Sequence, residues 1–140
     1  DHQRSPSGPD ADPAHGMRSI WLDTELNIWP DTLVVTLSEF GRTSMENGSF
    51  GTDHAEASCM FAAGGQVIGG VYNCDAVSWP QGSMFLVNNR YLSHLTDFRT
   101  VLAEVIDRFF NASTNLDAII PGWSGLSGPT YNYLNFLPSP

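Results

Sequence analysis

The chain has 140 residues, of which 41% are hydrophobic and 15% charged, which is enough apolar material for one domain with a packed core. Acidic residues outnumber basic ones by 15 to 6, which gives a formal net charge of -9, and every basic residue is an arginine. Nucleic acids and anionic membranes bind basic surfaces, so this charge argues against both as partners. No apolar run approaches the roughly 20 residues that span a bilayer, so we expect no membrane span.

The N-terminal 16 residues are rich in proline and glycine and show neither helical nor strand periodicity, so we expect them to be irregular. The sequence starts with neither a methionine nor a signal peptide, which favours a processed or partial chain. We divide the chain into an irregular segment (1–16), an α/β region (17–123) and an aromatic tail rich in proline and glycine (124–140).

Residues 17–29 carry apolar side chains three and four positions apart, which predicts an amphipathic helix that Pro30 ends. The apolar, β-branched run TLVVTL at 32–37 is typical of a strand buried on both faces in a parallel sheet. A polar, glycine-rich stretch at 38–54 follows it. Because α/β folds bind ligands at the carboxyl ends of their strands, this stretch is the first place to look for a site.

The second half of the chain adds two short strands, at 58–63 and 66–72, and the clearest helix, at 96–110, with Thr96 as its N-cap. The tail is too apolar to stay in solvent, so we expect it to pack on the domain or on another chain. These elements predict an α/β fold with a mostly parallel sheet. They are few for a complete sheet of that kind, which suggests that another polypeptide covers an open edge or face.

The sequence leaves two interpretations open for a pair of cysteines and for a pair of asparagines. Cys59 and Cys74 could form a disulfide in an oxidising compartment, or each could be a small buried apolar residue. Asn47 and Asn111 begin Asn-X-Ser sequences that match glycosylation acceptors, but such short motifs arise often by chance.

Four stretches in this order, TLVVTLSEFGRT, ENGSFGTDH, GGQVIGGVY and TDFRTVLAEVIDRFF, resemble the C-terminal part of a family of sulfatase-like secreted proteins. This is the 1501 family of domains of unknown function, in the alkaline phosphatase superfamily. The resemblance implies a three-layer α/β sandwich, export to the periplasm or outside the cell, and a centre for divalent metals such as zinc, manganese or calcium.

The resemblance also implies metal ligands residue by residue. In the superfamily one metal is held by an aspartate, a histidine a short loop later, and a distant histidine in a turn similar to GTDH. Asp1, His15 and His54 fall in those places, with His2 as a substitute for His15. Asp53 of the same turn is a further candidate, although turn formation accounts for it equally well.

The second metal of the superfamily takes an aspartate and a histidine directly after a strand. Here Glu39 and Phe40 stand in those positions, and only Glu39 is able to ligate. Arg42 either binds an anionic substrate or forms an internal ion pair with Glu39 that fixes the loop. His54 likewise has a plain alternative, in which it only makes hydrogen bonds within the loop.

Two functions of different classes follow from these observations. In the first, the chain is an exported metallohydrolase-like protein, and a metal polarises the phosphate or sulfate ester of an anionic substrate. The position of Phe40 leaves open whether hydrolysis still occurs. In the second, the chain is a non-catalytic structural subunit of an extracellular assembly or a larger complex. Its partners would be identical subunits or the upstream half of the fold.

Overall fold

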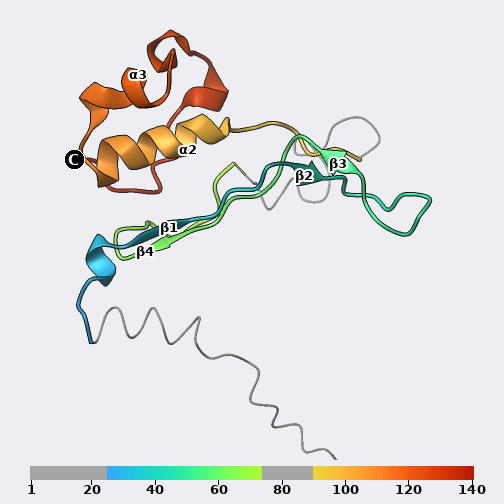
Figure 1. The fold of residues 1–140 in the computed structure, drawn as a ribbon, viewed down its shortest axis with the longest axis horizontal. Coiled ribbons are helices and arrows are strands. Elements are labelled where there is room, and N and C mark those ends of the chain that lie inside the picture. Colours follow the sequence, from blue (N-terminus) through green and yellow to red (C-terminus); the bar gives the residue numbers. More distant parts are fainter. Residues whose placement is uncertain (1–24, 74–89) are drawn as a thin grey trace, which may run out of the picture.

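The computed structural model describes residues 25–73 and 90–140 (Figure 1). The strands are β1 (Leu33–Val35), β2 (Gly41–Arg42), β3 (His54–Ala55) and β4 (Ala62–Gly64). The α-helices are α2 (Phe98–Glu104) and α3 (Leu116–Ile119), and α2 continues as a π-helical turn, Val105–Phe109. Short 3₁₀ helices lie at Trp29–Asp31, Ser113–Asn115, Trp123–Gly125 and Pro129–Tyr131.

The four strands form one long two-stranded ribbon, which runs out through β1 and β2 and back through β3 and β4 (Figure 1). Both ladders are antiparallel, with Leu33 opposite Gly64 and Arg42 opposite His54. The prediction of a parallel strand at 32–37 is therefore wrong within the described residues, because the chain turns back on itself as a hairpin. The predicted three-layer sandwich is not tested by these short strands and stays a prediction.

Burial of the first strand on both faces is also wrong for the described part of the chain. Leu33 and Val35 pack against the core, whereas the side chain of Val34 is 52% exposed. Neighbouring residues of a strand point to opposite faces, and only one face of this ribbon has a covering layer among the described residues.

Two other predicted elements differ from the structure. The predicted helix at 17–29 lies mostly outside the described residues, and its described end, 25–28, is not helical. Asn27 has a φ of 51°, a left-handed conformation that a right-handed helix does not continue through. The predicted strand at 58–63 overlaps β4, but the one at 66–72 does not form: Val67 donates to Gly64 in a turn, and Ile68 donates to Phe136 of the tail.

The helix at 96–110 is present with changed ends. Asp97 rather than Thr96 caps it, because its carboxylate accepts a hydrogen bond from the backbone N–H of Arg99 at 2.9 Å. No helix in the described ranges is long and apolar enough to cross a membrane.

Two apolar clusters lie on either side of α2. One joins the helix to the ribbon and contains Val101, Phe136 and Leu137, and the other contains Ala103, Leu116 and Ile120. The aromatic tail supplies Phe136 and Leu137, which are 3% and 1% exposed, so the tail packs back on this chain. The tail thus fills the space between helix and ribbon.

Candidate functional site

The candidate site lies at the far end of the ribbon, where the SEFGR and GTDH motifs meet. Gly41 pairs with Ala55 and Arg42 pairs with His54, so the two motifs are neighbouring strands. This approach requires glycine at position 41, since a Cβ there would lie 1.7 Å from the carbonyl oxygen of Ala57. The sequence predicted a site in this stretch, and the structure brings its two halves side by side.

Two aromatic rings stack at the centre of this end. The rings of Phe40 and His54 are 3.9 Å apart between centroids and 22° from parallel. The guanidinium carbon of Arg42 lies 5.0 Å from the centroid of Phe40, within range of a cation–π interaction. Phe40, which stands where the resemblance implies a ligand histidine, therefore supports the ring of His54.

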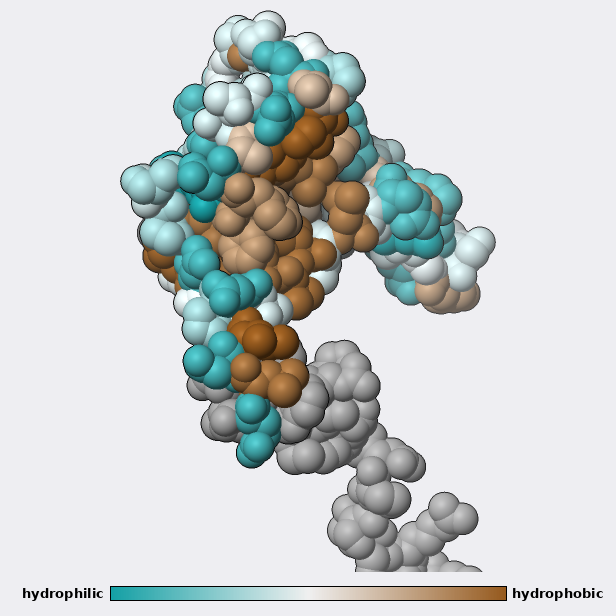
Figure 2. All heavy atoms as spheres, turned by 60° about the vertical axis from the view of Figure 1, so that its left-hand side comes forward, coloured by the Kyte–Doolittle hydropathy of each residue, from teal (hydrophilic) through white to brown (hydrophobic). Residues whose placement is uncertain are grey.

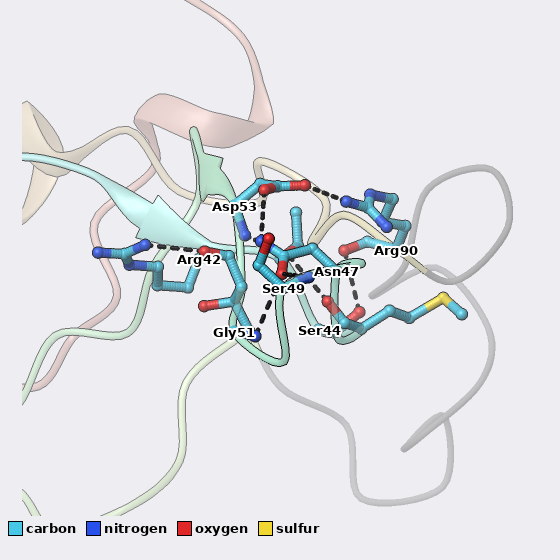
Figure 3. Close-up of polar contacts among 10 residues, drawn as sticks. Arg42, Ser44, Asn47, Ser49, Gly51, Asp53 and Arg90 are labelled. Atoms are coloured by element: carbon cyan, nitrogen blue, oxygen red, sulfur yellow. Dashed lines mark hydrogen bonds and ion pairs between the residues drawn. The ribbon is translucent and has the colours of Figure 1, made fainter.

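The loop between β2 and β3 is organised by one amide side chain (Figure 3). The Asn47 Oδ1 atom accepts hydrogen bonds from the backbone N–H groups of Ser49 and Gly51, at 2.9 and 3.1 Å. Its Nδ2 group donates to Asp53 Oδ1 at 2.8 Å. A glycan on Asn47 would remove one N–H from this amide, so the structure gives the side chain a role inside the loop.

Asp53 is held from both sides. Besides the bond from Asn47 it forms an ion pair with Arg90, whose backbone carbonyl accepts bonds from the N–H and hydroxyl of Ser44. The hydrogen bond from Asn47, assisted by the charge of Arg90, lowers the pKa of Asp53 from its usual value, although desolvation acts in the opposite direction. The carboxylate is therefore ionised at neutral pH and already has donors on both oxygens.

A pocket of about 380 Å³ opens beside the ring stack and is lined by His54, Ala55, Glu56, Tyr91 and Leu92. Glu56, Tyr91 and Arg90 were not predicted from the sequence. Glu56 could have been found, because it follows the candidate His54 by only two positions in the sequence. Arg90 and Tyr91 come from a distant part of the chain, and no local pattern points to them.

The comparison with protein families gives one match. The model of a family described as a protein of unknown function, DUF1501, covers residues 22–120. The chain belongs to this family. No curated protein and no solved structure matches the chain. The match includes the ring stack, the loop and α2 of this DUF1501 chain, and it ends before the tail.

The described residues of the DUF1501 chain do not make a complete metal site. Within 25–73 and 90–140, no three histidine, cysteine, aspartate or glutamate side chains lie together in a way that could hold a metal ion. Asp1 and His15, with the substitute His2, lie outside the described residues. His54 and Glu56 both line the pocket and are residue types that can bind zinc, but two such side chains fall short of the four ligands that zinc usually takes.

The remaining candidates have other neighbours. Glu39 is exposed, and Arg42 donates to the carbonyl oxygen of Thr52 at 2.9 Å. No ion pair joins Glu39 to Arg42, both of which are described, so the internal pair expected from the sequence is not formed. The side chain of Arg42 instead fixes the loop by binding the backbone carbonyl of Thr52. The nearby pocket offers an imidazole, a carboxylate and a phenol, which suit the binding of a small polar group.

Proposed function

We propose that this DUF1501 chain is an exported protein of metallohydrolase-like fold that does not hydrolyse its ligand and that acts by binding another polypeptide. The observation that carries the proposal is the stack of Phe40 on His54. An apolar ring fills the place next to His54 where a second metal of the superfamily would need a ligand. The resemblance of the SEFGR and GTDH motifs to secreted proteins supports export.

The contacts of Asp53 support the same conclusion. A metal ion at this carboxylate would have to displace Arg90 and Asn47, which already bind it. Displacing them would leave a guanidinium and an amide without their partner and would release the loop that they organise. Asp53 is thus better suited to fixing the loop than to holding a metal.

The polypeptide-binding surface is the outer face and free edge of the ribbon. Val34 and Phe61 are 52% and 72% exposed, and Val34 lies on the face opposite to the core-facing Leu33 and Val35. Figure 2 shows that apolar side chains gather over a broad part of one face of the molecule. The backbone N–H of Thr36 donates to the carbonyl of Phe61 on the returning strand. In an antiparallel ladder, successive residues direct their N–H and C=O groups to opposite edges, so those of Leu33 and Val35 point to the free edge of the ribbon.

The chemistry of this edge defines the partner. Residues 32–37 carry neither charge nor proline, the features that normally protect an exposed strand edge. The run is flanked by the exposed acids Asp31 and Glu39, in a chain of net charge -9. The occupant that fits is an extended apolar segment of another polypeptide with basic residues at its ends, added to β1 as a further strand.

A peptide-binding measurement on the full chain tests this proposal. The probe is a fluorescent peptide of alternating valine and threonine between two arginines, and the comparison is the same peptide with a central proline, which lacks the N–H that a strand needs. We expect Val34→Lys to weaken binding by about tenfold or more, and Val71→Lys, at an exposed position outside the ribbon, to leave it unchanged. Equal binding by the two peptides, or by the two variants, would refute the proposal.

A second candidate function is a metal-dependent hydrolase of anionic phosphate or sulfate esters. It is favoured by the pocket, which is lined by His54, Glu56 and Tyr91, and by the pairing of Arg42 with His54 in the neighbouring strand. Further ligands would have to come from residues such as Asp1 and His15. Elemental analysis separates the two functions: the hydrolase requires stoichiometric metal that His54→Ala removes, whereas the binding protein requires none and keeps its stability in a chelator.

A further inference from the structure

The last part of the chain, residues 130–137, which we call the strap, lies along α2 (Figure 1). At the start of the helix the Thr130 carbonyl accepts hydrogen bonds from the Asp97 N–H and the Thr100 hydroxyl, each 3.0 Å long. Near its middle the Tyr133 hydroxyl reaches the Ala103 carbonyl at 3.5 Å. The strap therefore follows the helix from its first residue onward and forms no β-ladder with it.

At the end of α2, two charged side chains bind the backbone of the strap. Glu104, which is 0% exposed, accepts hydrogen bonds from the N–H groups of Asn135 and Leu137 at 3.0 and 3.1 Å. Arg108 donates to the carbonyl of Leu137 and to the side chain of Asn135, both at 2.7 Å. The two charges also pair with each other at 3.3 Å. A buried carboxylate is tolerated because a guanidinium and two amide donors surround it.

Side-chain contacts next to this pair add selectivity. Phe136 and Leu137 are 3% and 1% exposed and pack with Val101 of the helix. Ile68 donates to the carbonyl of Phe136 at 2.8 Å, so the ribbon forms the second wall. Hydrogen bonds to the backbone together with filled apolar sites are how proteins bind peptide segments.

The segment that joins the strap to α3 contains two glycines in conformations that other residues rarely adopt. Gly122 and Gly128 have φ values of 81° and 110°, a region that favours glycine. The contacts of the strap with Glu104, Arg108 and the apolar cluster are non-covalent. The same contacts could therefore form with a strap from another molecule at little cost in energy.

We propose that Glu104 and Arg108 form a peptide-binding site, which the chain occupies with its own strap and which also accepts the strap of a second copy. The site lies within the part of the chain that matches the DUF1501 family, and its occupant follows that part. The proposal does not depend on the function of the pocket at His54, since no residue is shared between the two.

The first experiment cuts the segment between α3 and the strap in the folded, full-length chain. A protease site replaces residues 124–127, and after cleavage the strap fragment should co-elute with the rest of the chain. A fluorescent peptide of residues 128–140 should then exchange into the site, and the same peptide with Phe136→Ala and Leu137→Ala should bind at least about tenfold more weakly. Loss of the fragment without uptake of the peptide, or equal binding of both peptides, would overturn the proposal.

The second experiment uses uncut chains, so that it does not depend on the cleaved form staying folded. Two differently labelled copies are mixed in urea and refolded together at high concentration. We expect mixed dimers that decrease several-fold when excess strap peptide is present during refolding, and that persist in the control variant Glu56→Gln at the distant pocket. A chain that refolds only to monomers, or dimers that the peptide does not affect, would exclude exchange between copies.

Discussion

The region around α2 and the region of the ribbon are built in opposite ways. Beside α2 the fully buried side chains include polar ones, among them Glu104 and Thr100, each 0% exposed. In the ribbon, large apolar side chains such as Val34 and Phe61 are mostly exposed. Both regions therefore depart from the usual arrangement, the first by burying polar side chains and the second by exposing apolar ones.

The difference follows from how each region provides hydrogen-bond partners for its backbone N–H and C=O groups. The strap has no ladder, so its N–H and C=O groups need side-chain partners, and Glu104 and Arg108 supply them inside the protein. In the ribbon, each strand forms ladder hydrogen bonds along one edge, with its partner strand. Within the described residues, no layer covers the outer face of the ribbon. One region is closed by its own tail, and the other is left with an apolar surface that a partner could bury.

The strongest test of the closed region is Glu104→Ala. The substitution leaves the charge of Arg108 and the N–H groups of Asn135 and Leu137 without their acceptor in a buried place. We expect a loss of about 3–5 kcal/mol in the free energy of unfolding, measured with urea. Glu39→Ala is the matched control, because Glu39 is exposed, and it should change stability by less than about 0.5 kcal/mol. Equal effects of the two variants would show that the buried carboxylate does not organise the strap.

The ribbon has a corresponding test at Gly41, where β2 passes close to the returning strand. Gly41→Ala places a Cβ 1.7 Å from the Ala57 carbonyl oxygen, so the strands must move apart, at a cost of about 1–3 kcal/mol. Gly48→Ala is the control, since nothing lies within 4 Å of a Cβ at that position. Urea unfolding measures both changes. If the two variants were equally stable, the close approach of the strands at Gly41 would be disproved.

These positions also show what could be predicted from the sequence. The run at 32–37 and the periodicity of 96–110 identify a strand and a helix, because both patterns are local. The antiparallel direction of the strand could not be predicted, since it depends on where residues 43–53 turn the chain back. The predicted N-cap, Thr96, lies one residue before the observed one, Asp97. Both residue types cap helices well, and only the course of the backbone decides between them.

The site was predictable to a similar extent. The sequence predicted a site in the stretch after the first strand, and the two motifs of that stretch do lie side by side. The partner of Asp53 was not, because Arg90 is 37 positions away and no periodic pattern connects the two. The stack of Phe40 on His54 becomes visible only when the pairing of β2 with β3 is known. The pairing of Glu104 with Arg108 fits helical spacing, but the strap that they bind lies 27 to 33 positions further along the chain.

A smaller effect is expected at the loop between β2 and β3. Asn47→Ala removes the acceptor of two backbone N–H groups and the donor to Asp53, at a partly exposed position, and should cost about 1–2 kcal/mol. Because the bond from Asn47 is the largest cause of the lowered pKa of Asp53, that pKa should rise toward its usual value. NMR titration of the carboxyl group measures the shift. Asn111→Ala, at an exposed position outside the loop, should leave that pKa unchanged, and an unchanged pKa in Asn47→Ala would contradict the assignment.

The smallest effect is expected for Asp97→Asn, which separates the cap of α2 from its charge. Asparagine caps a helix about as well as aspartate, so the backbone bond to Arg99 is retained while the ion pair is lost. Since the arginine side chain is partly exposed to solvent, we expect a loss below about 1 kcal/mol at neutral pH. Hydrogen bonds from the Arg99 side chain lower the pKa of Asp97 from its ordinary value of 3.8.

The sign of the pH dependence follows from this shift. A carboxylate whose pKa is lower in the folded state contributes stability that is complete above the unfolded value of 3.8 and is lost as the pH falls through the folded value. The stability difference between the original chain and Asp97→Asn should therefore be constant from pH 7 down to about pH 5 and then shrink toward pH 3. Urea unfolding at each pH measures it. A difference that grows on acidification would mean that Asp97 is better stabilised when it is protonated, and the ion pair with Arg99 would then not hold the start of α2.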